Sequence, residues 1–175
     1  MIVRKSPHFD ERPPGEKVSL IVIHSISLPP GEYGGPWIDD LFMGTLDTKA
    51  HPYFATLEGV RVSSHFLIRR DGTLVQYVPC DKRAWHAGAS SWKGRERCND
   101  FSIGIELEGS DDVPFSEPQY ATLAELTQSL FKRYGILEIV GHSDIAPGRK
   151  TDPGPWFDWD RLRHSLRARL DHLSS

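Results

Sequence analysis

The 175-residue chain has few of the features that mark several large protein classes. It has two cysteines, Cys80 and Cys98, which are too few for a disulfide framework and lack the CxxC spacing of a metal motif. We therefore expect buried, reduced thiols, as in a cytoplasmic protein. No apolar run approaches the roughly 20 residues that a membrane span needs, so no membrane partner is expected. Residues 1–17 show no apolar segment typical of a secretory signal.

An excess of one charge is also missing. The 21 Lys and Arg residues nearly balance the 24 Asp and Glu residues, which leaves a formal net charge of -3 at pH 7. Without a basic surplus, nucleic acid is not an expected partner. No repeat or low-complexity tract divides the chain, and its length suits one domain with a full-sized core. We therefore predict a single domain over residues 1–175.

The apolar patterns that are present predict an α/β fold. Short β-branched runs at 18–24, 101–109 and 136–142 are typical of buried strands. Residues 63–78 contain two alternating runs around Asp71-Gly72, which predicts a β-hairpin with a type I′ turn. Together with the helices described next, these runs predict a central mixed β-sheet flanked by helices.

Three helices are expected between these strands. Residues 37–44 form a short helix that Gly44 should end. Ser116 and Gln119 have the spacing of a capping box and should open a helix that runs to about Tyr134. Leucines at helical spacing predict a last helix over about 157–173.

Two histidines and an aspartate are candidate metal ligands. His24 and His142 each stand at the end of a predicted strand, where functional groups gather in α/β proteins. Asp152 follows in a loop rich in Gly and Pro, residues 141–154. Two His and one Asp would give zinc three protein ligands and leave a fourth position for water, as in catalytic sites. For each histidine taken alone, an ordinary hydrogen-bonded loop residue is the more common case, and the spacing does not reverse this, since no HxxxH-type motif is present.

Two charged residues are candidates for catalysis. Glu106 shares a strand face with the small residues Ser102 and Gly104, which leaves room for a water that it could deprotonate as general base. A solvated strand face explains the pattern equally well. Lys150 could stabilise an oxyanion near Asp152, or be an ordinary surface lysine. Glu108, near the end of its strand, is expected to be a solvated or structural charge, and Arg149 a surface residue.

An aromatic and basic stretch precedes the Glu106 strand. Trp85 and His86 could line a substrate groove, although core packing explains Trp85 equally well. Arg61 and Arg97 could pair with a substrate carboxylate, or be solvated.

Several long segments of the chain together resemble one family. They are "VIHSISLPPGEYGGPWIDDLF" (22–42), "AHPYF" (50–54), "RVSSHFLIRRDGTLVQYVPCDKRAWHAG" (61–88), "GRERCNDFSIGIELEG" (94–109) and "GHSDIAPGRKTDPGPWFDW" (141–159). They are similar to the AmpD family, the 1,6-anhydro-N-acetylmuramyl-L-alanine amidases of cytoplasmic cell-wall recycling. The wider "GH…P.RK.DPG" pattern is shared with the N-acetylmuramoyl-L-alanine amidase superfamily, which includes phage T7-type lysozyme and the peptidoglycan recognition proteins.

The resemblance implies a T7-lysozyme-like fold and a specific set of site residues. It implies one zinc per chain held by His24, His142 and Asp152, with Glu106 and Lys150 catalytic. It places Trp85, His86, Arg61 and Arg97 in stretches that line the substrate groove. The resemblance also implies that Ser25 contacts substrate, at a position where Asn more often follows the first ligand.

The implied reaction is zinc-assisted hydrolysis of the amide between the lactyl group of anhydro-N-acetylmuramic acid and L-alanine. The partner would then be an anhydro-muropeptide, and a monomer is the working expectation. Two alternatives stay open: a phage-type or secreted amidase that acts on intact wall, and a non-catalytic peptidoglycan-binding module of the same fold. The second should lack a ligand or the Glu/Lys pair, and this chain has both.

Overall fold

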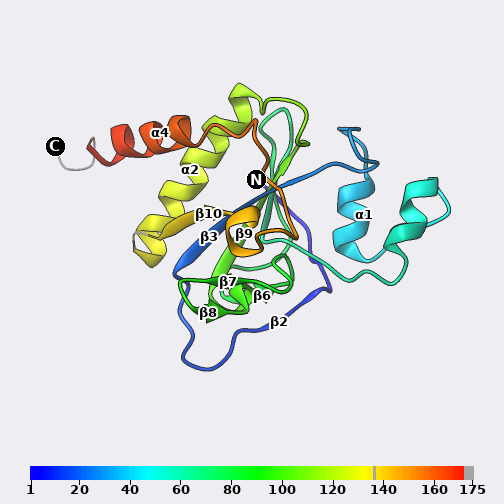
Figure 1. The fold of residues 1–175 in the computed structure, drawn as a ribbon, viewed down its shortest axis with the longest axis horizontal. Coiled ribbons are helices and arrows are strands. Elements are labelled where there is room, and N and C mark those ends of the chain that lie inside the picture. Colours follow the sequence, from blue (N-terminus) through cyan, green and yellow to red (C-terminus); the bar gives the residue numbers. More distant parts are fainter. Residues whose placement is uncertain (136, 172–175) are drawn as a thin grey trace.

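A six-stranded sheet forms the centre of the molecule in the computed structural model, which describes residues 1–135 and 137–171 (Figure 1). In spatial order its strands are β1 (Ile2–Val3), β5 (Leu74–Gln76), β4 (Phe66–Ile68), β9 (Ser102–Glu108), β3 (Leu20–Ile26) and β10 (Glu138–Gly141). Neighbouring strands pair in parallel, except β4 and β5, which are antiparallel. The predicted mixed sheet is therefore confirmed.

Helices lie on both sides of this sheet, and two short ribbons lie beside it. The helices are α1 (Trp37–Met43), α2 (Glu117–Tyr134), α3 (His142–Ile145) and α4 (Trp159–Asp171), with 3-10 turns η1 (Pro52–Leu57) and η2 (Cys98–Asp100). The ribbons pair β2 (Phe9–Glu11) with β6 (Lys82–Ala84), and β7 (Ser91–Trp92) with β8 (Arg95–Glu96). In Figure 1, α2 and α4 lie on one side of the sheet and α1 on the other. Helix α4 begins two residues later than predicted, and residues 172 and 173 of the predicted helix lie outside the described part.

The predicted helix ends follow from the local sequence. The Ser116 hydroxyl accepts a hydrogen bond from the Gln119 backbone N–H at 3.3 Å, and the Gln119 side chain accepts one from the Ser116 N–H at 3.0 Å. This reciprocal pair is the predicted capping box, and it satisfies two N–H groups that a helix start would leave unpaired. Gly44 ends α1 with a φ of 73°, a left-handed conformation that costs glycine little.

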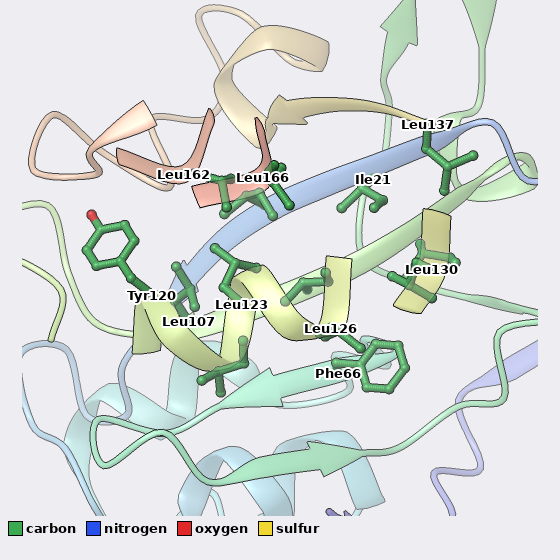
Figure 2. Close-up of a cluster of buried hydrophobic side chains, with 14 of the residues drawn as sticks. Ile21, Phe66, Leu107, Tyr120, Leu123, Leu126, Leu130, Leu137, Leu162 and Leu166 are labelled. Carbon is green, nitrogen blue, oxygen red and sulfur yellow. The ribbon is translucent and has the colours of Figure 1, made fainter. Parts of the chain in front are cut away.

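Alternation along β3 and β9 gives the two faces of the sheet different tasks. Ile21, Ile23, Ile103 and Ile105 pack into the apolar cluster that α2 and α4 cover, and Figure 2 shows α2 lying across it. The other face carries His24 and Glu106, which are directly paired in the register of the two strands. The large helices therefore hold the sheet from one side and leave the candidate site on the other.

Two local predictions were wrong. The β3 strand does not end at His24 but runs to Ile26, because Ser25 and Ile26 still find partners in Leu107 and Glu108 of β9. The hairpin is present, but its turn is not type I′, which needs a positive φ at both central residues. Here Gly72 alone of Asp71-Gly72 has one, at 85°. The Arg69 N–H bonds to the Thr73 carbonyl at 2.9 Å, so three residues rather than two form the loop.

The two cysteines are buried and unpaired, as predicted. In the described residues, no helix combines the length and the apolar character needed to cross a membrane.

A buried histidine directly before β4 makes the stability of the fold sensitive to acid. His65 is fully buried, with Nδ1 accepting from the Gly104 N–H at 3.0 Å and Nε2 lying 2.9 Å from the Lys82 carbonyl oxygen. Burial lowers the pKa of His65 to about 3, although the hydrogen bond to Lys82 opposes this. The unfolded chain therefore binds this proton at a higher pH than the folded chain does.

We expect stability to fall with pH below the unfolded histidine pKa of about 6.5, and to continue falling toward pH 3. His65 alone should contribute a loss of about 1.4 kcal/mol per pH unit in that window. Urea unfolding of wild type and His65→Gln at pH 7.5, 6.0 and 5.0 measures this contribution as the difference between the two slopes. Equal slopes for the two proteins would contradict the prediction.

Candidate active site

Three side chains from separate parts of the chain converge at the ends of the parallel strands. Nδ1 of His24 in β3 lies 3.0 Å from Nδ1 of His142, the first residue after β10. Oδ2 of Asp152 lies 3.2 Å from the first nitrogen and 3.1 Å from the second. Within the described residues these three form a group whose geometry could hold a metal ion. The sequence predicted this trio.

The donor set fits a tetrahedral ion. Zinc binds imidazole nitrogen and carboxylate oxygen at about 2.0–2.2 Å, so tetrahedral ligand atoms stand roughly 3.3–3.6 Å apart. The distances of 3.0–3.2 Å between the three atoms are only a few tenths of an ångström shorter. One side of such an ion would stay open to the cleft, as in catalytic zinc sites.

The protonation states of these residues also suit a cation. Burial lowers the pKa of His24, more than its hydrogen bond with Asp152 raises it. Burial alone would raise the pKa of Asp152, but in the metal-free protein hydrogen bonds and charge from His142 and His24 outweigh burial and hold that pKa below its usual value. A bound metal would displace any proton from the two histidine Nδ1 atoms and take its place beside the carboxylate. Neutral imidazole and ionised carboxylate are the forms that bind metals.

The backbone carbonyl of Ala87 orients His142. Its Nε2 lies 3.1 Å from the carbonyl oxygen of Ala87, so Nε2 carries the proton and Nδ1 presents its lone pair to the other two residues. Arg149 donates to the same carbonyl at 2.6 Å and to that of Ala89 at 2.7 Å. Arg149 is exposed, as expected of a surface residue, and its side chain also fixes the loop on which His142 depends.

Glu106 faces the three residues from the neighbouring strand. All of β9 is buried, so the alternative of a solvated strand face does not hold. Its Oε1 lies 3.9 Å from Nδ1 of His24, and its Oε2 is buried with no hydrogen-bond partner in the described structure. Burial and then the charge of Asp152 raise the pKa of Glu106 well above its usual value, with Lys150 opposing. A buried carboxylate oxygen without a hydrogen-bond partner lowers the stability of the fold, but it is suited to accept a proton from a bound water.

The neighbouring Glu108 has a structural task, as predicted. It is buried, receives the Gly34 N–H at 2.6 Å and the Arg70 N–H at 3.1 Å, and pairs with Arg69 at 3.2 Å. It thereby ties the loop before α1 to the sheet.

A cleft of about 460 Å³ opens above the trio. Lys150, Ser25, Trp85 and His86 line it together with the trio and Glu106, and apolar residues of α1 and η1 form another part of its wall. Lys150 is exposed at this rim. The cleft is therefore polar near the trio and apolar away from it, which suits an amphipathic ligand.

The two predicted arginines lie further away. Arg61 is exposed and stands over the Trp85 ring at 5.8 Å, while the Trp85 indole donates to Asp10 at 3.1 Å. Arg97 has an exposed side chain, pairs with Asp100 at 3.3 Å and has a φ of 56°. Neither arginine lines the central cleft, and their contact with a ligand remains a prediction.

The sequence interpretation missed Asn99, whose side-chain oxygen accepts the N–H groups of His86 at 3.1 Å and Ala87 at 2.9 Å. It lies in the "RERCND" stretch, which was interpreted only for its arginines. Its tertiary partners are in a separate loop, so no local pattern indicates them.

Comparisons with known proteins agree with this geometry. The model of the N-acetylmuramoyl-L-alanine amidase family matches residues 14–155. The 1,6-anhydro-N-acetylmuramyl-L-alanine amidase AmpD of Citrobacter freundii is 64% identical over 160 residues, which cover 90% of this chain and 86% of that protein.

Solved structures give the same result. The crystal structure of a Se-Met AmpD derivative matches with a TM-score of 0.93 at 61% identity, covering 94% of this chain and 93% of that one. The Escherichia coli amidase AmiD, in complex with the substrate anhydro-N-acetylmuramic acid-L-Ala-D-gamma-Glu-L-Lys, matches with a TM-score of 0.63 at 32% identity, over 90% of this chain and 65% of that one. The chain thus belongs to the N-acetylmuramoyl-L-alanine amidase family and, within it, to the AmpD amidases.

Proposed function

We propose that this chain is a zinc-dependent amidase that cleaves the bond between the lactyl group of 1,6-anhydro-N-acetylmuramic acid and L-alanine. One observation carries the proposal: a buried carboxylate, Glu106, whose Oε2 has no hydrogen-bond partner among the described residues, faces a His-His-Asp trio at the floor of an open cleft. A binding module has no need of a buried carboxylate without a partner, whereas a hydrolase does.

The substrate class is supported by the relatives. AmpD of C. freundii is named for the anhydro-muramyl amide, and AmiD was solved with an anhydro-muramyl tripeptide. We propose an anhydro-muropeptide as substrate, a cytoplasmic place in peptidoglycan recycling, and a monomer without nucleic-acid or membrane partners.

Each residue of the candidate active site has a separate role in the proposed amide hydrolysis. A zinc ion held by His24, His142 and Asp152 would lower the pKa of a bound water and polarise the substrate carbonyl. Glu106 takes a proton from the attacking water at Oε2, and the water oxygen adds to the lactyl carbonyl carbon. The ammonium of Lys150 stabilises the oxyanion that forms. Glu106 then returns the proton to the alanine nitrogen as the C–N bond breaks. The second proton of the water passes from the new carboxyl group to the amine or to solvent, which leaves a lactyl carboxylate and the freed amino group of the peptide.

Purified protein assayed on anhydro-muropeptide and on intact sacculi tests the substrate. We expect release of the peptide from the anhydro-muropeptide and far slower release from sacculi. Equal rates on both would favour an amidase of intact wall.

The metal makes a separate prediction. Metal analysis should find about one zinc per chain, and a strong chelator should abolish activity that added Zn²⁺ restores. Asp152→Ala should lower zinc content, because it removes one of three ligands, while the exposed Asp160→Ala on α4 should not. Active wild-type protein without zinc would rule out this site.

A further inference from the structure

His24 has a second nitrogen that faces away from the trio. Its Nε2 lies 2.9 Å from Nδ1 of His86, and the two rings meet edge to face with centroids 5.0 Å apart. We propose that His86 is a positioning residue that holds His24 in the tautomer with its lone pair on Nδ1. The inference rests on the proposed role of His24 as a metal ligand.

The direction of this hydrogen bond follows from the other contacts. If Nδ1 of His24 is to bind a metal, it must be free of hydrogen, so Nε2 carries the proton and donates it to His86. Nδ1 of His86 is then the acceptor, and its proton stands on Nε2, which lies 3.1 Å from the Ser102 hydroxyl oxygen. With this assignment, Nε2 of His24 donates to Nδ1 of His86, and Nε2 of His86 donates to the Ser102 hydroxyl oxygen. Each of these three nitrogens then has one suitable partner. The reverse assignment would point an N–H of His24 at His142 and Asp152, into the place of the metal.

The surrounding structure fixes the His86 ring closely. The backbone N–H groups of His86 and Ala87 both bond to the side-chain oxygen of Asn99. The ring lies flat against Gly104 of β9, where an added Cβ would stand 2.5 Å from Cγ of His86. Glycine inside a buried strand normally weakens it. The close approach of His86 gives a physical reason for a glycine at this position.

The inference explains why His86 lines the cleft without pointing its nitrogens into it. Both nitrogens are engaged, one by His24 and the other by Ser102. Partners of this kind orient metal-binding histidines and raise their basicity, and their loss typically weakens metal binding by about 10- to 100-fold.

The test measures zinc affinity by competition with a chromogenic chelator. His86→Leu keeps a branched side chain of similar reach but has no acceptor, and the zinc Kd should rise by about 10- to 100-fold. His86→Asn places an amide oxygen near the former Nδ1 and should recover most of that loss. His164→Leu, the same change on the exposed side of α4, should leave the Kd unchanged. Circular dichroism and thermal unfolding check that each variant is folded.

A second variant reaches His86 without altering any histidine. Gly104→Ala should displace the ring and weaken zinc binding by a similar factor. In a His86→Ala background the ring is gone, so Gly104→Ala should add little further loss. Additive losses would mean that Gly104 acts by another route and would overturn the inference.

The tautomer itself can be observed. In long-range ¹H–¹⁵N spectra of the zinc-loaded protein, His86 should carry its proton on Nε2. A proton on Nδ1 of His86, or a His86→Leu variant that binds zinc as tightly as wild type, would overturn the positioning role while leaving the proposed amidase intact. A wild-type protein that binds no zinc would instead overturn the proposed function.

Discussion

Replacing Glu106 with Gln will lower kcat by roughly 10²- to 10⁴-fold, the range for a lost general base, and leave zinc bound. Gln has the shape of Glu but cannot accept and return a proton at the reacting water. The side-chain atom of Gln that replaces Oε2 of Glu106 would lie in the same buried position, where the wild-type oxygen has no hydrogen-bond partner. The Oε1 atom of Glu106 is 3.9 Å from His24 Nδ1, beyond hydrogen-bond distance, so the metal ligands do not depend on it.

Zinc content and steady-state kinetics on anhydro-muropeptide check this result together. Glu106→Asp retains a carboxylate but withdraws it by one methylene, so its activity should fall between those of wild type and Glu106→Gln. The pH profile of Glu106→Gln should also lack the acid limb that the wild-type profile has, since that limb reports protonation of the base. If Glu106→Gln keeps near-full activity with zinc bound, the base is elsewhere.

The raised pKa of Glu106 gives the pH dependence its sign. Burial and the charge of Asp152 favour the protonated form, whereas a general base must be ionised. Activity should therefore decline as pH falls, at a higher pH than an exposed glutamate would give. A bound cation would lower this pKa, so the zinc-loaded enzyme should keep its activity to lower pH than the raised pKa of Glu106 in the metal-free protein implies.

Much of the fold follows from local patterns in the sequence. The β-branched run before His24 and the capping box at Ser116 each specify their element through short-range physics, and both elements are present. The predictions were wrong at positions where pairing with a neighbouring strand determines the structure. Strand β3 extends to Ile26 because β9 offers partners there, and the Asp71-Gly72 turn takes a three-residue form because the register of β4 and β5 requires it.

The candidate site likewise has residues that the sequence could predict and residues that it could not. The trio could be proposed from strand ends and a rigid loop, because parallel strands bring their carboxyl ends to one edge of a sheet. The contacts of His86, Arg149 and Asn99 could not, since each joins loops that meet only in the folded chain. Single residues of these types have no pattern that separates a surface role from a supporting one.

Lys150 is the second residue whose loss should be severe. It is exposed at the rim of the cleft, two residues before Asp152, and its positive charge lowers the pKa of Glu106. An ammonium placed there can stabilise negative charge that develops on the substrate carbonyl oxygen. Because that charge exists only in the transition state, Lys150→Ala should lower kcat and kcat/KM by similar factors of roughly 10² to 10³.

A lysine that only attracts an anionic muropeptide would behave differently. KM would rise while kcat stayed constant, and added salt would weaken the wild-type enzyme in the same way. Lys132→Ala on the exposed side of α2 removes the same charge far from the cleft and controls for net charge. Kinetics of the two variants at low and high ionic strength separate these cases. A Lys150→Ala enzyme with wild-type kcat and KM would show that this lysine has no part in the reaction, and that the oxyanion depends on the metal site alone.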